Sequence, residues 1–176
     1  MSVNKINFNS DLGEQDEIFF ANIDRPLITQ INSANISCLF HGGYPDVVQK
    51  AIHECQKQRV SIGAHVSFYD KENFGRKIQS WSKQSLHDLL QYQIQFMVNT
   101  TNDSCTLTTH LKPHGALSTL ACRDEDLAYE IVLFIKKFLI FSFRVLLLII
   151  AVSSSIIKSY FAEHIVVFHH SYNILV

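Results

Sequence analysis

Six side chains suited to acid–base or metal chemistry stand close to the ends of predicted strands. Two are carboxylates and four are imidazoles: Asp11, Glu14, His41, His65, His110 and His114. Imidazole and carboxylate groups together can hold a divalent metal that activates water, or they can transfer protons unaided, because the pKa of histidine lies near neutrality. The residue types alone leave both uses open.

The segment HLKPH, residues 110–114, carries two of these histidines. Pro113 disfavours helical backbone at Lys112, so we expect the segment to be extended. In an extended chain every second side chain lies on the same face, which places His110, Lys112 and His114 together. Three polar groups on one strand face indicate the lining of a cavity, since a packed barrel interior prefers branched apolar residues.

Plainer structural roles are open for several of these groups. A lone histidine is more often a hydrogen-bonded structural residue than a ligand, and we expect that role for the histidines of predicted helices: His53, His87 and His164. Asp11 and Glu14 could cap the helix that follows them. The polar run at residues 70–72 could be a solvated loop.

The elements that must position these residues alternate between strand and helix. Apolar or alternating runs predict strands at residues 6–11, 32–40, 60–64, 106–112, 145–152 and 165–168. Helices are predicted to begin at Pro45 and Ser82 and to span residues 123–139 and 154–163. Such alternation is typical of parallel α/β proteins, whose sites lie at the carboxyl ends of the strands. No internal repeat or linker is visible, so residues 1–176 are predicted to form a single domain.

Three of the predicted helices have apolar residues at helical spacing, which predicts their buried faces. These are Val48, Ala51, Ile52 and Cys55 in the first, Leu86, Leu89, Leu90, Ile94 and Met97 in the second, and Leu127, Ile131, Val132 and Ile135 in the third.

The composition is that of a globular chain. Of its 176 residues, 47% are hydrophobic and 18% are charged, and the formal net charge is −1, which suits one sizeable core. No basic run is interleaved with aromatic residues, so we expect no nucleic-acid partner. The four cysteines have no C-x-x-C spacing, and the amino terminus lacks a hydrophobic segment of signal-peptide length. We therefore expect reduced thiols and a cytoplasmic location.

The carboxyl third of the chain is strongly apolar between residues 131 and 152. Its longest stretch without charge, residues 145–157, is shorter than the roughly 18–20 residues that a membrane span requires. We expect a buried helix followed by a buried strand here, and no membrane partner.

The chain resembles the LamB/YcsF family in four motifs that occur in the family's order and spacing. They are NSDLGE at residues 9–14, SANISCLFHGG at 33–43, IGAHVSFYDKENFGR at 62–76 and HLKPHGAL at 110–117. The resemblance implies an α/β fold, an incomplete, distorted β/α barrel of the glycoside hydrolase/deacetylase type. It also implies the A component of an ATP-dependent 5-oxoprolinase, which opens 5-oxo-L-proline to L-glutamate with ATP as co-substrate and 5-oxoprolinase subunits B and C as partners.

The resemblance also implies which residues form the site. The catalytic set carried over by position is Asp11, His41, His65 and His114. Residues expected to bind substrate or an anion are Glu14, Asn73, Arg76 and Lys112. Whether a divalent metal is bound stays open, and its candidate ligands are again Asp11, His41, His65 and His114.

Several positions depart from the family pattern. Leu39 stands where the family usually has glycine, and Tyr44 stands where it has an acidic residue. The family-like part is residues 1–131, and we expect residues 132–176 to be a divergent, apolar tail of a truncated chain. Two alternatives follow: a truncated, catalytically inactive homologue, or a metal-dependent deacetylase or other hydrolase acting on a carbohydrate or amide.

Overall fold

The sheet of this protein is parallel and its strands lie in chain order. The computed structural model describes residues 7–102, 108–141 and 148–149. Its strands are β1 (Asn9–Leu12), β2 (Ser33–Ser37), β3 (Ser61–Val66), β4 (Thr108–Pro113) and β5 (Leu148–Ile149). Each strand pairs in parallel with the next, in the order β1-β2-β3-β4-β5. The expected α/β class is therefore confirmed, and the sequential parallel order matches an arc of a distorted β/α barrel.

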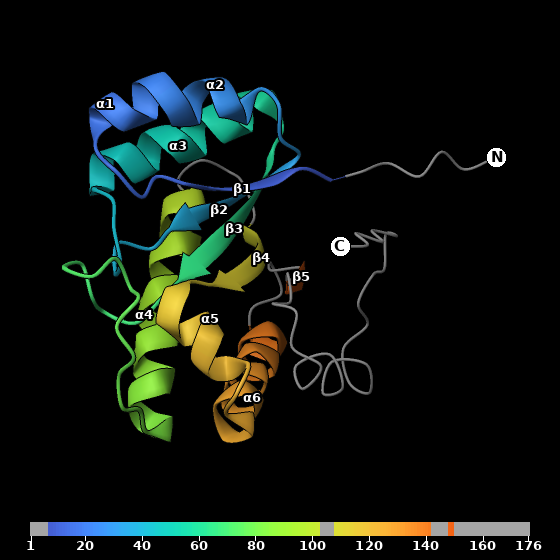
Figure 1. Cartoon of the computed structure of the whole chain (residues 1–176). Helices are drawn as coiled ribbons and strands as arrows, with labels where there is room; N and C mark the ends of the chain where they lie inside the picture. The colour runs from blue at the N-terminus through green and yellow to red at the C-terminus, as the bar shows by residue number, and fades with distance from the viewer. Residues whose placement is uncertain (1–6, 103–107, 142–147, 150–176) are drawn as a thin grey trace.

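Helices connect the strands and flank the sheet. They are α1 (Glu17–Phe19), the π-helix η1 (Phe20–Asp24), α2 (Arg25–Ile28), α3 (Pro45–Gln58), α4 (Lys83–Asn102), α5 (Gly115–Ala121) and α6 (Glu125–Phe141). In Figure 1, α1, α2 and α3 lie together at one end of the sheet, and α4, α5 and α6 lie together at the other. None of the described helices combines the length and the hydropathy needed to cross a bilayer.

The predicted helix starts and buried faces are confirmed. Pro45 occupies the first turn of α3, and the Ser82 hydroxyl accepts a hydrogen bond from the backbone N–H of Ser85 at the start of α4 (3.2 Å). All the predicted inward residues of α3, α4 and α6 are buried except Leu89, which is half-buried. The spacing of apolar residues was sufficient here because each helix packs one face on a single core.

The helices between residues 17 and 28, and α5, were not predicted. The first of these, α1, is capped by Asp16, whose carboxylate accepts a hydrogen bond from the N–H of Phe19 (2.9 Å). Ile18 and Ile23 are 71% and 50% exposed, so this segment presents no clean apolar stripe to the core. Asp16 is the cap, so the alternative that Asp11 and Glu14 cap this helix is wrong.

Several strand ends differ from the prediction, and two of these differences change the place of a histidine. The β2 strand ends at Ser37 rather than at residue 40, because Leu39 adopts a positive φ of 70° and turns the chain. His41 therefore lies in a loop four residues beyond the strand. The β3 strand continues to Val66, so His65 stands inside the strand, paired with Ser37 and Lys112.

The two faces of the sheet differ in polarity. On the face toward the helices, Ala34, Ile36, Ile62, Ala64 and Leu111 are all buried. On the opposite face, the alternate positions of the same strands carry polar groups that are also largely buried, including Asn35, Ser37, His65 and His110. This polar inner face carries the candidate site.

The part of the chain predicted to be divergent is described only to residue 149, and not between residues 142 and 147. The strand predicted at 145–152 is represented by Leu148–Ile149, which pairs with His110 and Leu111. The predicted helix at 154–163 and strand at 165–168 lie outside the described residues.

Candidate active site and metal centre

Three imidazoles and one carboxylate converge beyond the inner face of the sheet. Glu14, His41, His65 and His114, here called the imidazole cluster, offer ligand atoms that all lie within 4.8 Å of one another. Glu14 follows β1, His41 follows β2, His65 stands near the end of β3 and His114 follows β4. Four consecutive parallel strands therefore deliver one side chain each, because their carboxyl ends meet at the same edge.

The loop at residues 70–76 closes over this cluster. The carbonyl oxygen of Phe74 accepts a hydrogen bond from His114 Nε2 (2.8 Å). Gly75 has a φ of +66°, and a Cβ atom there would lie 2.7 Å from His41 Cβ and 2.9 Å from His114 Cδ2. Only glycine therefore fits between the two stacked rings and the loop.

Asp70 holds this loop in shape. Its carboxylate accepts hydrogen bonds from Asn73 Nδ2 (2.7 Å) and from the backbone N–H of Lys77 (3.0 Å). The bond from Asn73 is the main reason that the pKa of Asp70 is lowered. Lys71 and Glu72 are exposed, so the solvated-loop interpretation describes them and not Asp70.

The hydrogen-bond partners of His65 and His114 determine where their protons lie. His65 Nδ1 is 2.9 Å from the carbonyl oxygen of Lys112, and His114 Nε2 faces the carbonyl oxygen of Phe74. A carbonyl oxygen only accepts, so both of these nitrogens carry hydrogen. The other two nitrogens, His65 Nε2 and His114 Nδ1, face each other at 3.0 Å. In two neutral rings they present lone pairs to each other.

His41 is arranged in the same way. The hydroxyl of Ser67 donates to the carbonyl oxygen of Phe68 (3.0 Å), so it accepts from His41 Nδ1 (2.9 Å). His41 Nε2 then points its lone pair at Glu14 Oε1, 2.8 Å away. Burial lowers the pKa of both His41 and His114, which favours neutral rings. Lone pairs of His41 and His114, the Nε2 atom of His65 and the carboxylate of Glu14 thus converge on one place, an arrangement that a cation would satisfy.

Asp11 and Lys112 form a second feature beside the cluster. The Lys112 ammonium donates to both carboxylate oxygens of Asp11, at 2.7 and 2.8 Å. Asp11 Oδ2 lies 3.4 Å from His65 Nε2. Burial raises the pKa of Asp11, but hydrogen bonds and charge from His65 and Lys112 outweigh burial and hold that pKa well below its usual range. Asp11 is therefore a carboxylate at neutral pH.

The structure groups the predicted metal ligands differently from the sequence. It gathers His41, His65 and His114 with Glu14, a residue predicted to bind substrate, while Asp11 is held by Lys112. The reason is reach: Glu14 lies in the turn beyond β1 and has a longer side chain, whereas Asp11 stays within the strand.

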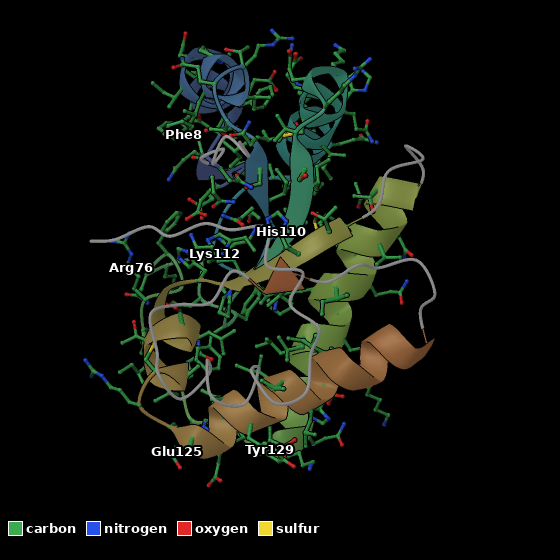
Figure 2. All side chains as sticks on the ribbon, turned by 90° about the vertical axis from the view of Figure 1, so that its right-hand side faces the viewer. Phe8, Arg76, His110, Lys112, Glu125 and Tyr129 are labelled. Carbon is green, nitrogen blue, oxygen red and sulfur yellow. The ribbon has the colours of Figure 1, made fainter. Side chains whose placement is uncertain are left out.

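The remaining predicted site residues lie outside the cluster. Asn73 is exposed and donates its side-chain amide to Asp70, and Arg76 is exposed with its guanidinium 5.5 Å from the centre of the Phe74 ring. Figure 2 shows Lys112 and His110 on β4 near the middle of the molecule, far from Glu125 and Tyr129 on α6. His87, predicted to be structural, bonds Glu130 on that helix (3.1 Å).

Sequence reasoning missed Asn35 and Ser67 as site residues. Asn35 is fully buried and bonds Asp11, while Ser67 is fully buried and bonds His41. A signal for Asn35 was present, because Ser33, Asn35 and Ser37 alternate with apolar residues in the predicted strand. Ser67 carried no comparable signal, since its position depends on how the chain leaves β3.

A cavity of about 300 Å³ opens beside the cluster. Its lining includes carboxylates and apolar groups: Asp11, Glu14, Phe19, Ile23, Leu27 and Phe74. Its volume is at the lower end of the roughly 300–1,000 Å³ typical of ligand sites, which suits a small molecule.

Comparison with known proteins places this geometry in a family. The model of the LamB/YcsF family matches residues 6–170. The A component of 5-oxoprolinase from Thermus thermophilus is 35% identical over 134 residues, covering 76% of this chain and 54% of the relative. That of Azoarcus sp. is also 35% identical over 134 residues, covering 76% and 52%. That of Alkaliphilus metalliredigens is 35% identical over 127 residues, covering 72% and 50%.

A solved structure agrees with the fold. The crystal structure of the lactam utilization protein from Thermus thermophilus superposes with a TM-score of 0.79 at 30% identity, over 90% of this chain and 62% of that one. The chain spans about half the length of the curated relatives it matches.

Proposed function

This chain belongs to the LamB/YcsF family, and we propose that it acts as the A component of a 5-oxoprolinase that opens 5-oxo-L-proline to L-glutamate with hydrolysis of ATP. The observation that carries the proposal is the imidazole cluster, buried beside the ionised Asp11 and next to a cavity of small-molecule size. The relatives are named as one lettered component of an enzyme, which supports assembly with further subunits, and we propose these to be subunits B and C.

Opening a lactam adds one water across the ring amide. The oxygen of water bonds the carbonyl carbon, the carbon–nitrogen bond breaks, and a proton is delivered to the departing nitrogen. Glu14 can accept the proton of the attacking water, and the imidazoles of His65 or His114 can relay it to the nitrogen, while Asp11, whose pKa is held low, would orient the water as a hydrogen-bond acceptor. Lys112 and Arg76 would attract the substrate's carboxylate, although the Lys112 ammonium is shared with Asp11.

The imidazole cluster also fits a divalent metal. Three imidazole nitrogens with their opposite nitrogens held as donors, together with a carboxylate, match the ligands preferred by zinc and related ions. We propose that Glu14, His41, His65 and His114 would hold it. A metal bound there would supply Lewis acidity toward the amide carbonyl.

A second candidate function follows from the same donor set. A metal-dependent deacetylase or other hydrolase acting on a carbohydrate or amide would use this cluster without ATP and without partner subunits. The second candidate predicts that the isolated chain turns over its substrate, whereas the first predicts turnover only with ATP and the partner subunits.

Reconstitution tests the first proposal. The full chain is mixed with subunits B and C, 5-oxo-L-proline and ATP, and glutamate is measured, with the A component of the Thermus thermophilus enzyme as the positive control. We expect glutamate only when all components are present. An active control alongside an inactive chain would overturn the proposal and favour the inactive homologue.

Turnover of an acetylated carbohydrate or a simple amide by the isolated, metal-loaded chain would instead support the second candidate. Metal analysis of the purified chain belongs to the same experiment, because stoichiometric zinc is expected if the cluster is a metal centre. A chain that is active and metal-free would eliminate the metal-dependent hydrolase.

A further inference from the structure

One row of the sheet runs beneath the imidazole cluster through Asp11, Asn35, Gly63 and His110. These four residues, here called the Asp11 row, are paired in register across β1, β2, β3 and β4. Gly63 leaves a gap in the row, because a Cβ atom there would clash with Cδ2 and Nε2 of His110. The His110 ring therefore lies over β3, and its Nε2 reaches Asn35 Oδ1 at 2.9 Å.

The direction of each hydrogen bond in the row follows from Asp11. An ionised carboxylate only accepts, so Asn35 must turn its amide nitrogen toward Asp11 Oδ1 (2.7 Å). The same amide donates its second hydrogen to Asn9 Oδ1 (2.6 Å). Asn35 Oδ1 then faces His110, and because that oxygen accepts, His110 Nε2 must carry hydrogen.

The second ring nitrogen of His110, Nδ1, faces the hydroxyl of Thr109. Nδ1 lies 2.8 Å from the Thr109 hydroxyl, whose single hydrogen can go either to Nδ1 or to the carbonyl oxygen of Ile62, 3.0 Å away. Burial lowers the pKa of His110 to about 4, so the ring is neutral at pH 7 with its hydrogen on Nε2. A neutral ring with hydrogen on Nε2 requires the Thr109 hydroxyl to donate to Nδ1 and not to Ile62, and donors and acceptors then alternate from Thr109 to Asp11.

We propose that Asn35 and His110 are positioning residues for Asp11: through the row they hold its Oδ1, so that Oδ2 stays turned toward His65. This inference deepens the proposed function, since it assigns a role at the same site. The Oδ2–His65 Nε2 separation of 3.4 Å is the distance that this support would maintain. Loss of the His110 donor would free Asn35 to rotate its amide, and the carboxylate would lose one of its three bonds.

The first test needs no catalysis. In the full chain labelled with nitrogen-15, the His110 ring is observed by NMR, and the His110→Leu variant identifies its signals. We expect a neutral ring with hydrogen on Nε2 that does not titrate above pH 5. Hydrogen on Nδ1, or titration near the ordinary histidine pKa, would overturn the proposal.

The second test uses the reconstituted complex with subunits B and C. We expect His110→Leu to lower kcat about 10–100-fold, the size of effect that misplacement of a catalytic group produces, with KM changed less than about twofold. His110→Gln keeps an N–H at the same reach and should restore kcat to within about threefold of the original. His87→Leu, which loses a bond to Glu130 far from the row, is the matched control and should leave kcat unchanged.

Failure of the two proposals can be told apart. If kcat of His110→Gln is no higher than kcat of His110→Leu, the positioning role is overturned. If the unmodified chain forms no glutamate with an active control complex, the proposed function fails, and the NMR result alone decides the arrangement of the row. Thermal unfolding of both variants shows whether each one folds.

Discussion

The imidazole cluster and the Asp11 row lie in adjacent layers of the same sheet face, and they satisfy their hydrogen bonds in opposite ways. In the row, donors and acceptors alternate from His110 through Asn35 to Asp11. In the cluster, His65 Nε2 faces His114 Nδ1 at 3.0 Å, and His41 Nε2 faces Glu14 at 2.8 Å, with each opposite nitrogen already held as a donor.

This difference in hydrogen bonding indicates different roles for the Asp11 row and the imidazole cluster. A complete series of donors and acceptors fixes side chains in place and leaves no capacity for a ligand. Converging lone pairs leave capacity for a cation, which can be a metal ion or a shared proton. We therefore expect the row to support the site and the cluster to bind a cation.

The largest expected effect comes from removing a ligand of the cluster. His65→Ala should weaken binding of zinc by more than the 10–100-fold (about 1.4–2.7 kcal/mol) that loss of an outer partner typically causes. Isothermal titration with zinc alone measures this, and His87→Ala is the control. Equal affinity in both variants would mean that the cluster is not the metal centre, and that a shared proton satisfies its lone pairs.

The next effect tests the gap at Gly63. Gly63→Ala should destabilise the fold by about 1–3 kcal/mol, because the added methyl group must displace the buried His110 ring. Urea unfolding measures the loss. In the double variant with His110→Ala the clash is absent, so the two changes should cost less together than their sum. If the losses in unfolding free energy of the two single variants simply add in the double variant, the His110 ring does not occupy the gap at Gly63.

The pH dependence of stability gives a smaller effect. The pKa of His110 is lowered from 6.5 to about 4 by burial, so the unfolded chain binds more protons between these values. Stability therefore rises with pH across this window, and His110 alone should remove about 2 kcal/mol between pH 7 and pH 5. The stability that ionised Asp11 contributes is lost only at still lower pH, since its pKa is lowered as well.

Urea unfolding at several pH values checks this prediction. His110→Gln cannot titrate, so its stability should fall less steeply between pH 7 and pH 5 than that of the unmodified chain. Identical slopes would contradict a buried, neutral His110.

The smallest effect is expected at Arg76. Its side chain is exposed and rests on Phe74, so Arg76→Ala should change the free energy of unfolding by less than about 0.5 kcal/mol. If Arg76 attracts the substrate's carboxylate, KM for 5-oxo-L-proline should still rise. A loss of stability without a change in KM would assign Arg76 to the loop rather than to the substrate.

Much of this organisation was predictable from local patterns. The strands and the face shared by His110 and Lys112 follow from short-range periodicity. The helix starts at Pro45 and Ser82 follow from the fixed backbone of proline and from serine capping. The catalytic and anion-binding roles of individual residues stay predictions, as does the single domain.

Other features depended on contacts between segments distant in the sequence. The exchange of Glu14 for Asp11 in the cluster depends on how far each reaches from β1. The role of Asn35 in holding Asp11 follows only from the strand register, which places Asn35 between Asp11 and His110.

The sequence by itself therefore determined which residue types are available and which face of a strand each one occupies, because side-chain alternation is a local property of extended backbone. Only the tertiary structure decided which groups meet and where their protons lie. That depends on the register of parallel strands, on the turn at Leu39 and on the loop at Gly75, all of which are set by contacts between distant segments.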